Sequence, residues 1–166
     1  HYAKLQTLQD LPSEDILLVP FVNAAFWMIP IHVLQKVGGF CPLFYHYGED
    51  KDFVNRLHYH QYQVGYSPQV FGNHDREYRP LTHEGFLRTE SVYHLSEYVN
   101  INHPWLKAFG YGVLAVMKKA LTSLISGKFQ LSKDYLRMGF QLLSRSTEIQ
   151  SYRKINRLSQ PHYIQK

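Results

Sequence analysis

The hydrophobic and polar positions of this 166-residue chain change character near its midpoint. In the first half, short apolar runs rich in β-branched and aromatic residues alternate with proline and glycine, a pattern typical of strands and turns. The strands that this pattern predicts lie at residues 16–19, 22–29, 64–66 and 70–73.

Two helices are also expected in the first half. Pro30 suits the first turn of a short helix over residues 31–36, and Gly38-Gly39 ends it. A second helix begins at Gly48-Glu49-Asp50, with Phe53, Val54 and Leu57 on one face at helical spacing.

From residue 81 onward the apolar positions recur at helical spacing, and we expect helices over residues 84–99, 105–126 and 131–145. The segment after Gln150 carries little apolar pattern, so we expect it to be loosely held. The fold class predicted is α/β over residues 1–80, followed by a C-terminal α-helical extension over residues 81–166.

The amino-acid composition and net charge exclude some classes of protein and favour certain kinds of partner. The chain is 45% hydrophobic and 15% aromatic, enough to form a packed core and to exclude intrinsic disorder. Its single cysteine, Cys41, excludes a disulfide framework and a structural zinc site built on several thiolates, which favours a reducing compartment such as the cytoplasm. A net charge of +5 favours phosphate-bearing partners: nucleic acid, an anionic membrane face or a nucleotide-linked substrate.

The chain opens without a signal-peptide pattern and without methionine, so we expect a piece of a longer protein. Residues 16–34 are apolar enough to suggest a membrane span. Pro20, Asn23, Pro30 and His32 interrupt them, however, and a proline inside a helix costs about 3 kcal/mol. We therefore expect no transmembrane segment here.

An ordered set of motifs occupies residues 21–77. It comprises Phe21-Val22-Asn23-Ala24-Ala25-Phe26-Trp27, Val37-Gly38-Gly39-Phe40, Tyr47-Gly48-Glu49-Asp50-Lys51-Asp52-Phe53-Val54-Asn55-Arg56, Tyr66-Ser67-Pro68 and His74-Asp75-Arg76-Glu77. The set resembles the acceptor-binding half of family 2 inverting glycosyltransferases of the GT-A fold, particularly the rhamnosyltransferase-like members. The resemblance covers roughly the first half of the chain and implies a partial GT-A domain.

The resemblance implies that Asp50 is the catalytic base, with Glu49 beside it contacting the acceptor or supporting the site. Inverting transfer needs a base that removes the proton of an acceptor hydroxyl as its oxygen attacks the anomeric carbon. A helix N-terminus favours the ionised carboxylate that such a base requires. The same effect lets acids in a first turn stabilise any helix, so a purely structural explanation stays open for Glu49, Asp50 and Asp52.

By the same resemblance, His74 would bind a divalent metal, Mn or Mg, that also holds the donor diphosphate, or would contact the diphosphate directly. Asn23 and Trp27 would line the sugar cleft from a strand, although Trp27 could equally be a core residue. Tyr47 and Asp75 would be cleft neighbours. Asp52 and Arg56 would recognise acceptor or phosphate, but their four-residue spacing equally suits an ion pair within the helix.

The chain departs from the family pattern in three respects. Gln61 stands where relatives place a glycine before the strand that leads to Tyr66-Ser67-Pro68. Cys41-Pro42 follows Gly-Gly-Phe where many relatives carry an acidic residue. No Asp-x-Asp motif precedes Phe21, so the nucleotide-binding half implied by the resemblance is absent here. We therefore expect the isolated 166 residues to be catalytically inactive.

Three roles stay open for the helical extension: packing on the α/β half, lying on an anionic membrane through the basic amphipathic helix around Lys118-Lys119, or forming a homodimer. The resemblance favours peripheral association with the inner face of the cell membrane, because such enzymes often extend lipid-linked glycans.

The function expected is inverting, metal-assisted transfer of a sugar from a nucleotide-sugar donor to a hydroxyl of a glycan or lipid-linked acceptor, in surface polysaccharide biosynthesis. A non-catalytic carbohydrate-binding or scaffolding module is the alternative, because aromatic residues such as Trp27, Tyr45 and Tyr47 could stack on sugars without chemistry. Nucleic acid is not an expected partner, since the basic residues are spread over the helices without a recognisable binding motif.

Overall fold

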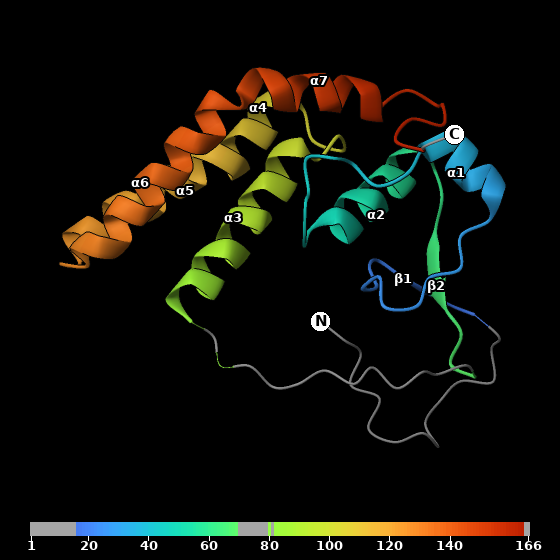
Figure 1. The fold of residues 1–166 in the computed structure, drawn as a ribbon, viewed down its shortest axis with the longest axis horizontal. Helices are drawn as coiled ribbons and strands as arrows, with labels where there is room; N and C mark the ends of the chain where they lie inside the picture. The colour runs from blue at the N-terminus through green and yellow to red at the C-terminus, as the bar shows by residue number, and fades with distance from the viewer. Residues whose placement is uncertain (1–15, 70–79, 81, 165–166) are drawn as a thin grey trace.

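A computed structural model describes residues 16–69, 80 and 82–164, and these form a mostly helical structure (Figure 1). The elements in chain order are β1 (Leu17–Val19), α1 (Ile31–Val37), α2 (Glu49–Tyr59), β2 (Val64–Tyr66), α3 (His83–Val99), α4 (Trp105–Phe109), the π-helical turn η2 (Gly110–Leu114), α5 (Ala115–Ile125), α6 (Phe129–Ser144) and α7 (Ser146–Asn156). The helix-rich second half is thus confirmed, whereas the described residues of the first half form α1, α2 and one small sheet.

The sheet is an antiparallel ribbon of β1 and β2, in which Leu17 lies opposite Tyr66 and Val19 opposite Val64. Both strands lie where the sequence predicts them. The strand expected over residues 22–29 is wrong: the amide of Ala25 donates to the carbonyl of Asn23 at 2.8 Å, so the chain turns there. The fourth expected strand, residues 70–73, lies outside the described residues.

The predicted helices lie within about two residues of their expected bounds. Thr82 caps α3, its hydroxyl accepting from the amide of Gly85 at 3.0 Å. The expectation of a loose tail after Gln150 is wrong, because α7 extends to Asn156 and buries Ile149, Arg153 and Asn156 on one face.

Two apolar clusters hold the elements together. The larger lies among α3 to α7 and includes Cys41, Leu43 and Phe44 from the loop that precedes α2. The smaller lies between α1 and α2, where Val33, Val37, Phe53 and Leu57 are buried. The loop before α2 therefore packs into the helical half of the chain.

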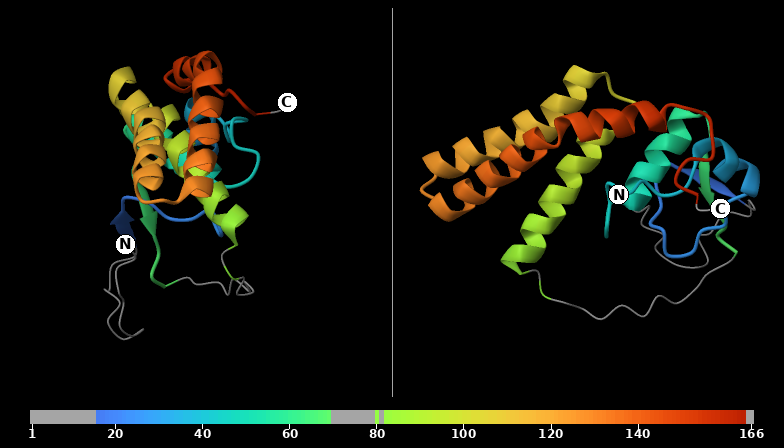
Figure 2. Two further views of the ribbon diagram at one scale, coloured as in Figure 1. Left: turned by 90° about the vertical axis from the view of Figure 1, so that its left-hand side faces the viewer. Right: turned by 45° about the horizontal axis from the view of Figure 1, so that its top comes forward.

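Figure 2 shows α5 and α6 as an antiparallel hairpin that extends away from α1 and α2. The helix entering this hairpin contains the π-helical turn η2, which passes very close to α3: a Cβ on Gly112 would lie 2.5 Å from the Cβ of Tyr98. The carbonyl of Tyr111 in this turn accepts a hydrogen bond from His94 Nδ1 at 2.9 Å.

The residues after α7 return to the start of the fold. The amide of Gly39 donates to the carbonyl of His162 at 2.8 Å, and Tyr163 Oη donates to Asn156 Oδ1 at 2.8 Å. Gly38 has φ +83°, and a Cβ there would lie 2.4 Å from the His162 carbonyl oxygen. Only glycine therefore suits this close approach.

Candidate functional site

The candidate site is the first turn of α2, which follows an unusual backbone turn. Tyr47 has φ 70° and Gly48 has φ 90°, so two successive residues adopt positive φ values. Gly48 is required because a Cβ there would lie 2.7 Å from Val92 and 2.9 Å from Phe44. Tyr47 has a side chain and pays a conformational cost on the order of 1 kcal/mol, while its ring is 46% exposed.

Glu49 and Asp50, the acids expected to carry the chemistry, are adjacent in this first turn and half-buried. The carboxylate of Asp50 accepts the backbone N–H of Lys51 at 2.7 Å. Glu49 Oε2 is buried and has no hydrogen-bond partner among the described residues. A buried carboxylate oxygen without a partner is energetically costly, and such groups are concentrated at functional sites.

The neighbouring cation does not neutralise these carboxylates. Lys51 Nζ lies 2.7 Å from Glu97 Oε1 on α3 and 4.7 Å from the centre of the Tyr93 ring, so it is directed toward α3. Within the part of the chain that the structure describes, neither Glu49 nor Asp50 forms an ion pair. Two adjacent carboxylates at a helix N-terminus, a position that favours negative charge, are thereby left without a cation partner among the described residues.

Asp52, the third acid of the turn, has a different role. Its carboxylate accepts from Arg56 Nε at 2.8 Å, and the two side chains are 2% and 0% exposed. Arg56 also donates to the carbonyls of Val37 and Gly39, at 2.8 and 2.7 Å. The ion pair that the spacing indicates is confirmed, while the expected role of Asp52 and Arg56 in substrate recognition has almost no exposed surface to support it.

This pair fixes the Gly38-Gly39 segment against α2. Burial is the main influence on the pKa of Asp52 and raises it, while the guanidinium of Arg56 acts in the opposite direction. The guanidinium also lies 5.0 Å from the centre of the Phe53 ring and 5.8 Å from that of Tyr163. Arg56 therefore joins α1, α2 and the C-terminal segment at one point.

Trp27 and Asn23 lie in the irregular segment between β1 and α1, and not in a strand as expected. Trp27 packs against Phe53 and Phe40, with ring centres 5.7 and 6.3 Å apart, which makes it part of the smaller apolar cluster. Its Nε1 is buried and has no hydrogen-bond partner in the part of the chain that the structure describes. Asn23 is exposed, and so is the ring of Tyr45, beside Tyr47 in the loop before α2.

The predicted metal ligand His74 and the predicted cleft residue Asp75 lie outside the described residues. The residues that are described contain no group of three or more His, Cys, Asp or Glu side chains that could hold a metal ion. They therefore do not form the expected Mn or Mg site by themselves.

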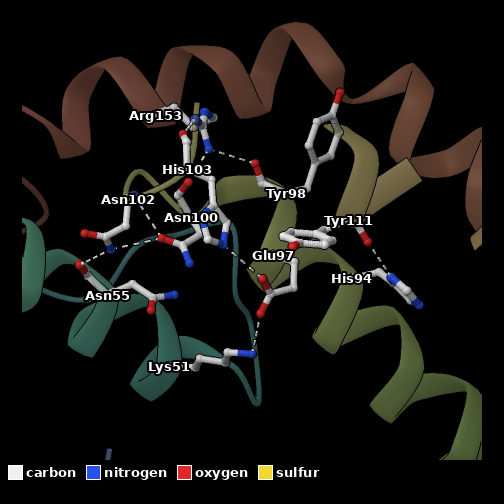
Figure 3. A network of polar contacts seen from close by, with 10 residues as sticks. All are labelled: Lys51, Asn55, His94, Glu97, Tyr98, Asn100, Asn102, His103, Tyr111 and Arg153. Carbon is white, nitrogen blue, oxygen red and sulfur yellow. Dashed lines mark hydrogen bonds and ion pairs between the residues drawn. The ribbon is translucent and has the colours of Figure 1, made fainter. Parts of the chain in front are cut away.

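Figure 3 shows a polar network that positions α2, and sequence reasoning missed it. The carboxylate of Glu97 on α3 forms an ion pair with Lys51 of α2, and its Oε2 lies 3.6 Å from His103 Nε2. Asn102 Nδ2 donates to the carbonyl of Asn55 on α2 at 2.8 Å. Because these contacts join α2 to the end of α3, they hold the Glu49–Asp50 turn in a fixed orientation.

Arg153 anchors the other end of this network (Figure 3). It donates to the carbonyls of Tyr98, Asn100 and His103, at and just beyond the end of α3, where the last carbonyls of a helix have no intrahelical donor. The carbonyl of Asn100 also accepts from the amide of His103 at 3.3 Å. Burial lowers the pKa of Arg153 to about 10, so it stays charged at neutral pH. The spacing of Ile149, Arg153 and Asn156 by four and three residues is the signal that could have identified it.

Other reactive groups are poorly suited to catalysis. Burial raises the pKa of the Cys41 thiol to about 12, so it is not a nucleophile at neutral pH. A hollow of about 520 Å³, open to solvent, lies between the start of α3 and the turn from α5 to α6, away from α2.

Comparison of the chain with protein-family models found no matching family, and comparisons with curated proteins and with solved structures found no match.

Proposed function

We propose that this chain supplies the acceptor-activating part of an inverting glycosyltransferase of the GT-A fold. The observation that carries the proposal is the state of the three acids in the first turn of α2. Asp52 is neutralised by Arg56, whereas Glu49 and Asp50 have no cation partner among the described residues. The ordered motifs around them resemble family 2 glycosyltransferases, and this resemblance is the second support.

In the proposed reaction, Asp50 accepts the proton of an acceptor hydroxyl while the hydroxyl oxygen forms a bond to the anomeric carbon of the donor sugar. The bond from that carbon to the nucleoside diphosphate breaks on the opposite side, and the diphosphate leaves with its electron pair. Asp50 lies in the first turn of α2, where the helix dipole favours a negatively charged side chain. Glu49, whose Oε2 is buried without a partner among the described residues, would support the site beside Asp50.

The resemblance also implies a divalent metal that neutralises charge on the leaving diphosphate. His74 would be its ligand in this chain. The proton transfer assigned to Asp50 takes place at the acceptor hydroxyl.

The test is transfer by the protein at its full natural length from a panel of nucleotide sugars, followed by release of the nucleoside diphosphate. Asp50→Asn is expected to reduce the rate by about 10²–10⁴-fold, since it removes the base. Glu84→Gln is the matched control, because Glu84 lies in the first turn of α3 and is exposed. Equal activity of Asp50→Asn and the wild type would overturn the proposal.

A thermal-shift scan against nucleoside diphosphates, with and without Mn²⁺ or Mg²⁺, identifies the donor. A ligand at one hundred times its Kd stabilises the folded protein by about 2.7 kcal/mol, which is readily visible. Stabilisation by one diphosphate that depends on metal is the expected result.

A non-catalytic carbohydrate-binding module is the second candidate, favoured by the exposed aromatic rings of Tyr45 and Tyr47 directly before the acidic turn. Sugar binding without turnover, unchanged in Asp50→Asn and lost in Tyr45→Ala, would select this candidate over the transferase.

A further inference from the structure

The hairpin of α5 and α6 carries many large apolar side chains that face solvent. Ile125 is 77% exposed, Phe129 64% and Phe140 62%. The other exposed apolar residues of the hairpin and of its entering turn are Leu114, Leu121, Leu124, Leu136 and Leu143. An apolar surface of this kind on a globular domain marks an interaction site.

Helical spacing places these side chains on one face. Leu121 and Ile125 of α5 lie seven and eleven residues after Leu114, so the three side chains share one side of the helix. The exposed residues of α6 are likewise spaced by seven, four and three residues: Phe129, Leu136, Phe140 and Leu143. The buried residues of each helix, such as Ala120 and Gly139, lie on other sides, where the two helices meet.

Contacts with Glu90 show which side of the hairpin α3 covers. Lys119 of α5 forms an ion pair with Glu90, and Tyr135 Oη of α6 donates to the same carboxylate at 2.9 Å. Lys119 and Tyr135 lie away from the apolar stripes on their helices, so the apolar face is the one opposite α3. We refer to it as the hairpin face.

Positive charge accompanies the hairpin face. Lys118, Lys133 and Arg137 lie within or beside the apolar stripes, and all three are exposed. Between residues 105 and 144 the only acidic residue is Asp134. Its carboxylate lies 3.0 Å from His83 Nε2 at the start of α3, on the other side of the hairpin.

We propose that the hairpin face lies on an anionic lipid bilayer, with its apolar side chains inserted among the acyl chains and its three cations at the headgroups. Apolar residues flanked by lysine and arginine are the features that bind such surfaces. A symmetric second copy fits poorly, because an isologous contact would bring the same cations together without an acid to neutralise them.

The hairpin lies along the bilayer and does not cross it. The run Trp105–Ile125 has 21 residues and contains an 18-residue window with a mean hydropathy of 1.3, which by length and composition suffices for a span. However, Lys118 and Lys119 would then lie inside the membrane, together with Lys133 and Arg137 of the packed helix α6. Charges at that depth are costly, whereas an in-plane helix keeps them at the surface.

The test is co-sedimentation of the full chain with vesicles of phosphatidylcholine alone and of phosphatidylcholine mixed with phosphatidylglycerol. Binding to the anionic vesicles, weakened by salt, is expected. The double variant Ile125→Ser, Phe140→Ser is expected to reduce the partition coefficient by more than about tenfold. Its matched control is Phe26→Ser, Tyr45→Ser, which alters two exposed aromatic residues outside the hairpin and is expected to bind as the wild type does.

A second variant tests the charges without altering the apolar residues. Lys118→Gln, Lys133→Gln, Arg137→Gln is expected to remove the preference for anionic vesicles, with a loss of about fivefold for each residue. All three side chains are exposed, so the variant is expected to fold normally.

Three results would overturn the proposal: no binding to either vesicle, equal binding of wild type and the Ile125, Phe140 variant, or a stable dimer in solution that this variant dissociates. The last would assign the hairpin face to a second copy. Asp50→Asn is expected to bind vesicles normally, so failure of membrane docking and failure of the proposed transfer are measured separately.

Discussion

Asp52 and Arg56 form a buried ion pair across one turn of α2, with Arg56 Nε 2.8 Å from Asp52 Oδ2. The pair lies two residues after the proposed base, so one helical turn contains both a carboxylate that stabilises the fold and carboxylates that are available for chemistry. The two kinds of acid should respond differently to substitution.

Asp52→Asn is expected to lower the free energy of unfolding by about 3–5 kcal/mol, because it leaves the buried guanidinium of Arg56 without its counter-charge. Asp50→Asn should lower it by less than about 1 kcal/mol, the usual contribution of an acid to a helix N-terminus. Urea unfolding of both variants measures the difference. Equal losses would show that Asp50 also has a structural partner.

Glu49→Met is expected to stabilise the protein by about 1 kcal/mol, since it removes a buried carboxylate oxygen that has no partner in the described structure. Functional residues often reduce stability in this way. Glu84→Met, which alters an exposed acid in the first turn of α3, is the control and should be slightly destabilising. A clear loss of stability in Glu49→Met would argue against the functional assignment of this residue.

Arg153→Met is expected to destabilise the protein by about 3–5 kcal/mol. The substitution retains the apolar part of the side chain but removes the guanidinium donor of the carbonyls of Tyr98, Asn100 and His103, and Asn100 keeps its bond from the His103 amide at 3.3 Å. Lys154→Met, at the exposed neighbouring position, should change stability by no more than about 0.5 kcal/mol. Thermal or urea unfolding of the two variants provides the measurement.

Stability is expected to fall on acidification between about pH 6.5 and pH 4, in part through His162. Burial lowers the pKa of His162 from 6.5 to about 4, and the charges of Arg56 and His60 act in the same direction. In that range the unfolded chain binds a proton at His162 that the folded chain does not, so unfolding becomes easier as the pH falls.

The variant His162→Gln should therefore show a shallower dependence of unfolding free energy on pH over this range. His32→Gln, which alters an exposed histidine, is expected to keep the wild-type profile. Identical pH profiles for wild type and His162→Gln would contradict the prediction.

The helices that the sequence predicts correctly owe their signal to apolar residues on one face. The helix α7 gave no such signal, since two of the residues on its buried face, Arg153 and Asn156, are polar and are buried only because α3 provides carbonyl partners for Arg153. The strand predicted over residues 22–29 is wrong because its signal was only local. The β-propensity of these residues is high, but Pro20 and Pro30 bound the segment and the chain turns at Asn23.

At the candidate site, the sequence correctly predicted that Glu49 and Asp50 lie in the first turn of a helix. It also predicted that Asp52 and Arg56 are spaced to form an ion pair. It did not indicate which acids are neutralised, because that depends on distant groups. Arg56 is buried because the backbone of Gly38 and Gly39 and the C-terminal segment pack around its guanidinium. Contacts between residues so far apart in the chain leave no local pattern.

The return of the C-terminal segment to Gly38 and Gly39 has a consequence for biosynthesis. The amide of Gly39 is hydrogen-bonded to the carbonyl of His162, so more than a hundred further residues must be translated before this contact can form. Until then the neighbouring guanidinium of Arg56 lacks its cover from Tyr163. During translation the surroundings of Gly39 and Arg56 are thus expected to be completed only after residue 163 has emerged from the ribosome.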